Sequence, residues 1–492
     1  MITTQSILPL YPILISFIAS GLIAISGRFP NLREAWTFVA GLCKLGCIVY
    51  MLPWILKGEV LKITLLNLLP NLSIALRVDA FGMMFAIVAS SLWILTSMYS
   101  VGYMRPLKEH AQTRYYCFFA LALSATIGVA FAANLFTMYV FYEILSLSTY
   151  PLVTHHQDKE ARGGGRKYLS YLLGTSIGFL LPAMILSYVL GGTLDFSANG
   201  VFSTMPSLSV VTLLFFLFIF GFAKSGIMPF HSWLPGAMVA PTPVSALLHA
   251  VAVVKVGVFC IFRVMTGIFG VSMLQLTQLP LILCILASIT ILVSSLIALS
   301  QDNLKRLLAF STIGQLSYII LGVALLSASG LKGSMLHIVM HAFGKITLFF
   351  CAGAIFVATG KKYISQMKGI GRKMPFTMAA FTLAALSIIG FPPLGGFLSK
   401  IYLIVGALEA QYMWVMLVLL TSSFLNAAYF FPIIYKAFFL KPDDETNTGI
   451  KEAPLLAMLP PVITAICSIT LFLYPSVFNS LADLMLQWGV HQ

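Results

Sequence analysis

Charged residues are scarce in this chain. They make up 9% of its 492 residues, against 59% hydrophobic residues, and the mean hydropathy is +0.97. A soluble domain covers its surface with far more charge, so this composition excludes an ordinary soluble protein and predicts extensive contact with lipid. Long polar segments are missing too, because the connections between apolar runs reach only roughly 20 residues, which leaves no room for a soluble domain.

The motifs of cofactor enzymes are also absent. The seven cysteines are scattered without a close CxxC pair, and the chain contains no GxGxxG or P-loop pattern. We therefore expect no cofactor and no metal site. The first ten residues contain no lysine or arginine, so the first apolar run is expected to be a retained helix rather than a cleaved signal peptide.

Apolar windows of about 20 residues, the length that crosses a bilayer as a helix, recur along the whole chain. They predict an all-α polytopic membrane protein with about 14 transmembrane helices. The windows lie near 7–26, 36–56, 79–101, 115–132, 134–153, 168–190, 208–234, 241–265, 279–300, 304–327, 331–358, 376–408, 411–435 and 454–474.

The basic residues are distributed unevenly between the gaps that separate these windows. Of 29 Lys and Arg, 19 lie in gaps after odd-numbered windows or at the adjoining window ends, and 5 lie in or beside gaps after even-numbered ones. This asymmetry predicts that the loops after odd-numbered helices face the cytoplasm and that both termini lie outside. The formal charge of +14 then reflects the orientation of a multi-pass protein in the cell membrane, and we expect no nucleic-acid partner.

One acidic residue, Glu143, lies deep in a window, in NLFTMYVFYEILSLSTYPLV. Asp79, at the start of the third window, is expected to cap a helix. The expected cationic partner of Glu143 is Lys224, in the run FAKSGIMPFHSWLP. A static buried pair barely recovers its desolvation cost. We therefore expect a proton site in which Glu143 holds Lys224 protonated when close and lets the proton go when distant.

Further titratable residues lie in other windows. PTPVSALLHAVAVVKVGVF carries His249 and Lys255, about 9 Å apart along a helix, a distance that waters could bridge. In GSMLHIVMHAFGKITLFF, His337, His341 and Lys345 are spaced i, i+4, i+8 and form one polar stripe. Two histidines at i, i+4 could also bind a metal, but no third ligand is evident, so a hydrated proton relay is the favoured interpretation.

Prolines interrupt two of the windows beside a lysine. Pro229 follows Lys224, and Pro392 and Pro393 precede Lys400 in SIIGFPPLGGFLSK. Proline inside a membrane helix is tolerated where the freed backbone groups line protein or water, so helices 7 and 12 are expected to be broken. Lys44 in the second window is expected to be a peripheral residue that snorkels toward the interface.

Helices 7 and 12 are each the fourth helix of a five-helix unit, helices 4 to 8 and 9 to 13, which indicates two repeats. Because each unit has an odd number of helices, the second crosses the membrane in the opposite orientation to the first. The predicted divisions are 1–114 for helices 1 to 3, 115–265 and 266–438 for the two repeats, and 439–492 for a loop and helix 14.

The block FAKSGIMPFHSWLPGAMVAPTPVSALLHAVAVVKVGVF, with GFPPLGGFLSK later, resembles the antiporter-like membrane subunits of Mrp-type sodium/proton antiporters, respiratory complex I and membrane-bound hydrogenases. The likeness covers roughly helices 3 to 13. Chain length and Lys400 resemble the D-type component of an Mrp antiporter or the complex I subunit nearest the quinone module. The resemblance implies that Glu143, Lys224, Lys255 and Lys400 carry protons, and that His249, His337, His341 and Lys345 connect them.

The resemblance implies a proton-translocating subunit of a multi-subunit Na⁺/H⁺ antiporter, a transporter rather than an enzyme, with other membrane subunits, protons, Na⁺ and lipid as partners. The alternative is a proton-pumping membrane subunit of a complex I-like NADH:quinone oxidoreductase or a membrane-bound hydrogenase. A third possibility is a scaffold that transports nothing.

Overall fold

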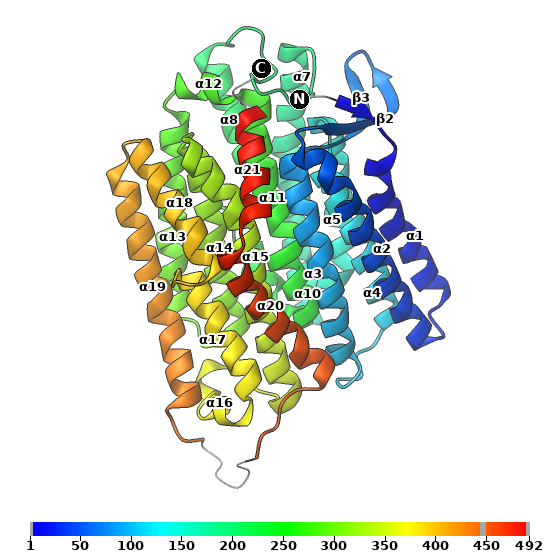
Figure 1. Ribbon diagram of the computed structural model, residues 1–492, viewed down its shortest axis with the longest axis vertical. Coiled ribbons are helices and arrows are strands. Elements are labelled where there is room, and N and C mark those ends of the chain that lie inside the picture. Colours follow the sequence, from blue (N-terminus) through cyan, green and yellow to red (C-terminus); the bar gives the residue numbers. More distant parts are fainter. Residues whose placement is uncertain (1–2, 443–448, 489–492) are drawn as a thin grey trace.

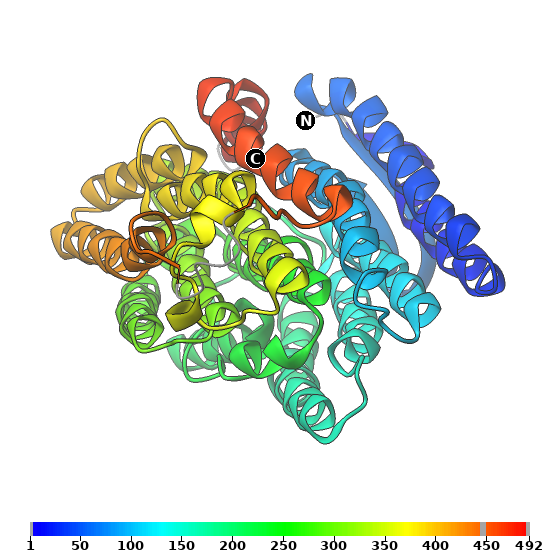
Figure 2. The same cartoon turned by 90° about the horizontal axis from the view of Figure 1, so that it is seen from below.

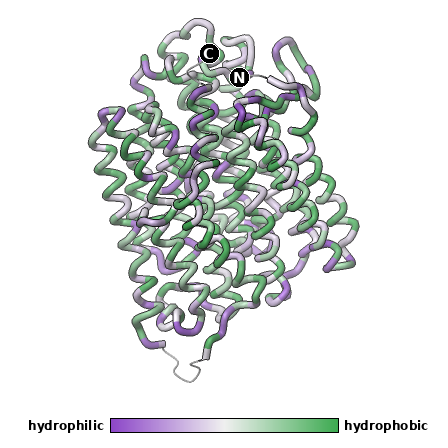
Figure 3. Tube along the Cα trace, viewed as in Figure 1, coloured by the Kyte–Doolittle hydropathy of each residue, from purple (hydrophilic) through white to green (hydrophobic). Residues whose placement is uncertain are grey.

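The computed structural model describes residues 3–442 and 449–488. Long helices run roughly parallel to one another (Figure 1), with hydrophobic residues along their length and many of the hydrophilic residues toward the two ends of the bundle (Figure 3). Helices suit an apolar solvent because every backbone N–H and C=O group can be satisfied within the segment.

Eleven spans in the described part of the chain are long and apolar enough to cross a membrane. They coincide with eleven of the fourteen predicted windows. They are η1–α1 (Leu8–Ile25), α2 (Pro30–Leu56), α3 (Ala80–Met104), α4 (Gln112–Ala130), α6–η2–α7 (Lys159–Gly191), α10–η5–α11–η6 (Thr242–Phe269), α13 (Leu279–Leu299), α14 (Leu304–Ala324), α15 (Ala328–Thr359), α19 (Met413–Phe438) and α20 (Leu455–Leu473).

The three remaining windows include both predicted breaks. Window 5 is the continuous helix α5 (Leu135–Val153). Window 7 is divided into α8 (Leu208–Gly221), a 3₁₀ turn η3 (Ala223–Ser225) and α9 (Trp233–Gly236), and window 12 into α17 (Pro375–Ile389) and α18 (Gly395–Glu409). The predicted breaks are confirmed. The predicted total of 14 crossing helices is not, because eleven spans among the described residues are long and apolar enough to cross a membrane.

The structure also contains a small sheet that the all-α prediction did not include. Strand β1 (Thr3–Gln5) pairs in parallel with β2 (Val60–Leu69), which forms an antiparallel hairpin with β3 (Leu72–Val78). Asn71 in the turn has a left-handed backbone (φ 57°), the conformation that tight hairpin turns require. The sheet lies at the end of the bundle opposite α16 (Ile370–Lys373), as Figure 1 shows.

The remaining short helices were not predicted either: η4 (Ala237–Val239), α12 (Val271–Gln275), η7 (Ile364–Gln366) and α21 (Ser476–Trp488). Helix α21 packs with α20 against α3 and α15. Viewed along the bundle, α1 and α2 form one edge and α19 the opposite edge (Figure 2).

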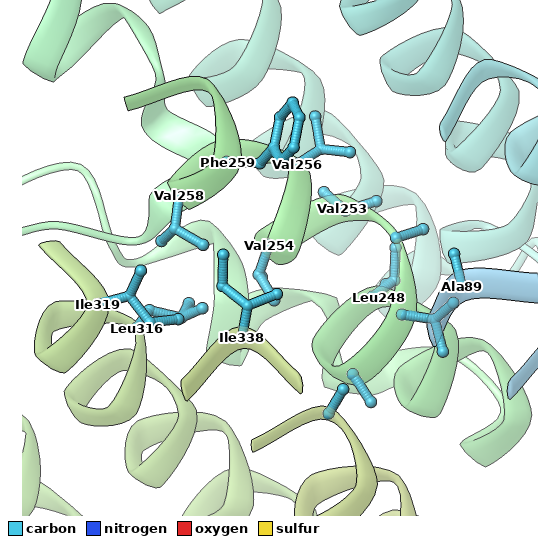
Figure 4. Close-up of a cluster of buried hydrophobic side chains, with 14 of the residues drawn as sticks. Ala89, Leu248, Val253, Val254, Val256, Val258, Phe259, Leu316, Ile319 and Ile338 are labelled. Carbon is cyan, nitrogen blue, oxygen red and sulfur yellow. The ribbon is translucent and has the colours of Figure 1, made fainter. Parts of the chain in front are cut away.

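The centre of the bundle is built from α11 (Val253–Val264), α14 and α15. Their apolar side chains interlock with one another and with α3 (Figure 4). The side chains in this cluster include Ala89, Leu248, Val253, Val254, Val256, Val258, Phe259, Leu316, Ile319 and Ile338, all buried. Close packing of this kind holds the polar side chains between them in defined positions.

The predicted cap at Asp79 is confirmed. Its carboxylate accepts a hydrogen bond from the backbone N–H of Gly82 (2.9 Å) at the start of α3. The same carboxylate also accepts a hydrogen bond from Arg263 of α11 at 2.5 Å. Arg263 was counted with the loops when the basic residues were assigned to gaps. It lies inside α11 instead and is buried. The cap therefore also ties α3 to the centre of the bundle.

Candidate functional site

Lys224 lies in the break of window 7, on the turn η3, with its side chain fully buried. The next residue but one, Gly226, has a left-handed backbone (φ 71°), a conformation that glycine adopts without steric cost. The chain therefore leaves the helical path directly after the lysine.

The partners of Lys224 are neutral groups of α5. Its Nζ donates hydrogen bonds to the backbone carbonyl of Tyr142 (2.9 Å) and to Oγ of Ser146 (2.6 Å). The ammonium group also lies 3.0 Å from the centre of the Tyr142 ring, where the π-face attracts a cation. These contacts bind the lysine without neutralising its charge.

The predicted contact between Lys224 and Glu143 is not formed in this structure. Among the described residues, both carboxylate oxygens of Glu143 are buried and have no hydrogen-bond partner. The reason is helical geometry. Tyr142 and Ser146, four residues apart, share the face of α5 toward Lys224, whereas Glu143 is about 100° further round on the side of the exposed Leu147. In this structure the two groups therefore form neither a hydrogen bond nor an ion pair.

Lys255 has a partner that the sequence did not indicate. Its Nζ is in close contact with Nδ1 of His341, on α15. His249 lies in the π-helical turn η5 (Leu247–Val251) and packs against Phe349, with ring centres 4.8 Å apart. Neither ring nitrogen of His249 has a hydrogen-bond partner among the described residues. The direct neighbour of Lys255 is therefore a histidine of another helix.

The three residues of the predicted stripe lie on α15 and are all buried. The rings of His337 and His341 stack with centres 5.7 Å apart. His337 contacts Oγ of Ser399 through Nδ1 (2.9 Å) and Oε1 of Gln315 through Nε2 (3.1 Å). The first of these contacts connects the stripe to α18.

At the other end of the stripe, Lys345 donates to Oγ of Ser311 at 2.6 Å. That hydroxyl lies 2.7 Å from the hydroxyl of Tyr429, on α19. The stripe therefore connects α14 and α19 as well, through neutral groups.

Lys400 lies in α18, shortly after the break of window 12, and its side chain reaches back to the groups that the break leaves free. Its Nζ donates to the carbonyls of Ile388 (2.8 Å) and Ile389 (2.9 Å), the last residues of α17, and to Oγ of Ser423 (3.1 Å). Carbonyls at the end of a helix lack intrahelical donors and attract cations. Gly390, with φ 93°, turns the chain away directly after them.

The contacting residues missed at the sequence level include Ser146, Gln315, Tyr318 and Ser399. Tyr318 lies between Lys400 and His337, because its ring centre is 4.9 Å from Nζ of Lys400 and 5.5 Å from the His337 ring centre. Small polar residues inside apolar windows were the available signal. Such side chains often donate a hydrogen bond to a carbonyl of their own helix instead, so without the fold they are a weak indication of a contact between helices.

The prediction that Lys44 snorkels is wrong. Its side chain is 0% exposed, and its Nζ donates to the carbonyl of Leu123 (3.0 Å) and lies over the ring of Trp93. Packing of α2 against α3 and α4 covers it. Lys44 is separate from the groups described above, since none of its contacts involves them.

The break of window 7 packs directly on α11 at Gly257. A Cβ atom there would collide with the backbone N of Ser225 and the carbonyl carbon of Lys224. Gly257→Ala is therefore expected to displace Lys224 and to lower the free energy of unfolding by about 1–3 kcal/mol or more. Thermal unfolding of the purified chain checks this. Gly46→Ala, in an open position of α2, is the control, and equal melting of the two variants would contradict the expected collision.

A second group of titratable side chains lies outside the spans, where the α3–α4 and α5–α6 connections meet. Glu109 accepts a hydrogen bond from His156 that lowers the pKa of the carboxyl and raises that of the histidine. Burial lowers the pKa of His155 to about 4. Glu109 and His156 also line a cavity of about 760 Å³ whose wall includes His231 and Lys305.

Taken together, the buried groups form a discontinuous polar series through the centre of the bundle. It leads from Lys224 across the α11 contact at Gly257 to Lys255 and His341, and from His337 through Ser399 toward Lys400. Each of these side chains is buried among protein groups. Such a series can hold and exchange protons.

Residues 132–426 match the family described as NADH:quinone oxidoreductase/Mrp antiporter, TM. The chain is 33% identical over 392 residues to NADH-quinone oxidoreductase subunit N of Desulforudis audaxviator, which covers 78% of this chain and 76% of the relative. It is 30% identical over 471 residues to Na(+)/H(+) antiporter subunit A1 of Staphylococcus aureus, covering 88% of this chain and 57% of that subunit. The chain thus spans little more than half of the antiporter subunit.

Two solved structures have the same fold. A chain of the Mrp complex from Dietzia sp. superposes with a TM-score of 0.85 at 22% identity, covering 97% of this chain and 96% of that chain. A chain of the membrane-bound sulfane sulfur reductase, an archaeal respiratory membrane complex, gives 0.88 at 24% identity, with coverage of 99% and 98%.

Proposed function

Because this chain belongs to the NADH:quinone oxidoreductase/Mrp antiporter family of membrane subunits, we propose that it moves protons within a multi-subunit Na⁺/H⁺ antiporter. Other membrane subunits are its proposed partners, since both structural neighbours come from membrane complexes. Protons are the ions that pass through this chain, and Na⁺ exchange is a property of the assembly. A sodium site needs several oxygen ligands, and Glu143 is the one acidic residue deep in the predicted windows.

The observation that carries this proposal is the lack of acidic partners around the buried lysines. Lys224, Lys255, Lys345 and Lys400 contact carbonyls, hydroxyls or a histidine. The lysines that do have a carboxylate within 4.0 Å include Lys62 and Lys332, which lie outside this series. A buried charge without a counter-ion is costly. Permanent ion pairing therefore does not explain these four lysines, and proton exchange does.

In the proposed mechanism, Glu143 tunes Lys224. When the carboxylate approaches, it stabilises the ammonium group, and when the two groups are unpaired, as in the arrangement described above, Lys224 passes its proton toward Lys255. His249, His337, His341 and Lys345 connect the two broken helices, and Lys400 receives or releases the proton at the second break. Hydrated gaps carry the proton where side chains do not touch.

The proposed orientation follows from the basic residues. Loops after odd-numbered windows, including the α3–α4 and α5–α6 connections, face the cytoplasm, and both termini face outward. Residues 115–265 and 266–438 are proposed as two inverted repeats, with helices 1 to 3 before them and the C-terminal helices after them. The corresponding positions of Lys224 and Lys400 at the two breaks support this division.

A second candidate function is proton pumping within a complex I-like NADH:quinone oxidoreductase or a membrane-bound hydrogenase. The coverage of 76% of subunit N, against 57% of the antiporter subunit, favours it. In that case electron transfer elsewhere in the complex powers the same relay. The D-type component of an Mrp antiporter, with which Lys400 agrees, stays a prediction.

One experiment separates the two functions. Inverted vesicles from cells that express the chain with its neighbouring genes are energised, and the pH gradient is followed with a fluorescent amine. For the antiporter, added Na⁺ collapses the gradient, and the collapse requires this chain. For the redox complex, NADH or another donor builds a gradient that requires this chain, whereas Na⁺ has no effect. If the chain changes neither signal, both proposals fail.

Lys400→Ala is expected to slow proton-coupled transport about tenfold or more, because it removes the group that occupies the second break. Three hydrogen bonds donated by Lys400 are lost, two of them to backbone carbonyls that then need water. The measurement is the initial rate of the pH change at matched protein abundance. Wild-type rates from Lys400→Ala, combined with inactive Lys224→Ala, would place the second half of the pathway elsewhere.

A further inference from the structure

We propose that Glu109, His110 and His155 form a binding site for a zinc-class divalent transition metal between the α3–α4 and α5–α6 connections. One ligand atom from each of these residues lies within 4.8 Å of the others. Imidazole nitrogen and carboxylate oxygen are the donors that Zn²⁺ combines with an open fourth position for water. The site is separate from the proton series within the bundle.

His155 is the strongest indication that this group binds a ligand. Its side chain is 0% exposed, yet neither ring nitrogen has a hydrogen-bond partner among the described residues. The nearest carboxylate oxygen, Oε2 of Glu109, is 3.8 Å from its Nε2, beyond a hydrogen bond. Buried imidazoles ordinarily find a partner, and a metal ion would supply one to this ring.

The surroundings hold the three ligands near the geometry that a metal needs. The rings of His110 and His155 lie with centres 4.8 Å apart. In a tetrahedral zinc site, ligand atoms are about 3.3 Å apart, so ligand atoms that now lie within 4.8 Å of one another must approach by up to about 1.5 Å. His110 is exposed at the end of the loop, where its ring is free to turn toward the other two ligands.

Residues around the ligands also orient them, as in metal sites with an ordered outer shell. His156 contacts Oε2 of Glu109 at 3.3 Å, and Arg114 donates to the backbone carbonyl of His155 at 2.7 Å. A bound ion would thus join two connections that already meet. Since Glu109 also lines the 760 Å³ cavity, the ion would fix part of the cavity wall.

The test is direct metal binding to the purified full-length chain, carrying an affinity tag without histidine and stripped with a chelator. Zn²⁺ is titrated calorimetrically, and Co²⁺ serves as an optical probe of tetrahedral coordination. We expect one ion per chain and a higher melting temperature with Zn²⁺. His155→Gln and the exposed His110→Gln should each weaken binding about tenfold or more. His231→Gln, in the same cavity wall but outside the group, should bind like the wild type.

Absence of stoichiometric binding to the wild type overturns the proposal, as does equal binding by His110→Gln and the wild type. A loss in His231→Gln that matches the loss in His110→Gln also overturns it, because binding would then not depend on these ligands. If His155→Gln fails to fold, His110→Gln alone decides, since its side chain is on the surface. None of these measurements depends on transport.

Discussion

Lys224→Ala abolishes proton-coupled transport while the chain still assembles, if the relay operates as proposed. The lysine is the titratable group of the first break, and its removal deletes the hydrogen bonds that it donates to the Tyr142 carbonyl and to Oγ of Ser146. General acid–base groups commonly contribute about 100-fold or more to a rate, so the expected loss is of that order. The measurement is the initial rate of the pH change in inverted vesicles, normalised to the amount of assembled complex.

Lys44→Ala is the matched control for this prediction. Lys44 is as deeply buried as Lys224 and donates to a single backbone carbonyl, but it has no contact with the polar series. We expect it to lower thermal stability and to leave transport per assembled chain close to that of the wild type. If Lys224→Ala transports like the wild type at matched abundance, the relay does not pass through Lys224.

Glu143→Gln is expected to have an effect as large as that of Lys224→Ala. The substitution keeps the size of the side chain and removes its charge. Because neither carboxylate oxygen has a hydrogen-bond partner among the described residues, the amide breaks no interaction that holds the fold. The melting temperature should therefore stay near that of the wild type while transport falls about 100-fold. Both quantities are measured on the same membrane preparation.

Glu143→Asp provides the graded comparison. It retains the carboxylate and shortens its reach by one methylene group, so transport should be reduced but present. A static packing role predicts a different order, in which the shorter aspartate, which leaves a gap, is the more harmful change. Transport by Glu143→Gln equal to that of Glu143→Asp would therefore contradict the tuning role of the charge.

Local sequence patterns were sufficient for most of the architecture. Windows of apolar residues identified the helices because a bilayer imposes one length on any segment that crosses it. Pro229 and the Pro392–Pro393 pair located the breaks, since proline removes a backbone donor wherever it stands. The cap at Asp79 followed from the same local rules. The hairpin of β2 and β3 was missed. Lys62, Asn67 and Arg77 interrupt its leucines, so the segment was interpreted as a connection between apolar windows.

Pairwise contacts between helices were the part that sequence patterns did not predict. Lys255 was assigned to His249 on its own helix, yet it contacts His341 of α15. Glu143 was assigned to Lys224, and the rotation of α5 turns it away. The His110–His155 group was not recognised at all, and no metal was expected, because its two halves are separated by α4 and α5.

The sequence by itself determined that this chain lies in lipid, where its helices break, and which ionisable groups it carries into the apolar interior. Those features depend on hydropathy and backbone chemistry, which act within a few residues. Only the tertiary structure decided which of those groups meet. Helix rotation and the close approach of backbones at Gly257 set the distances between them, and these result from packing among segments far apart in the chain.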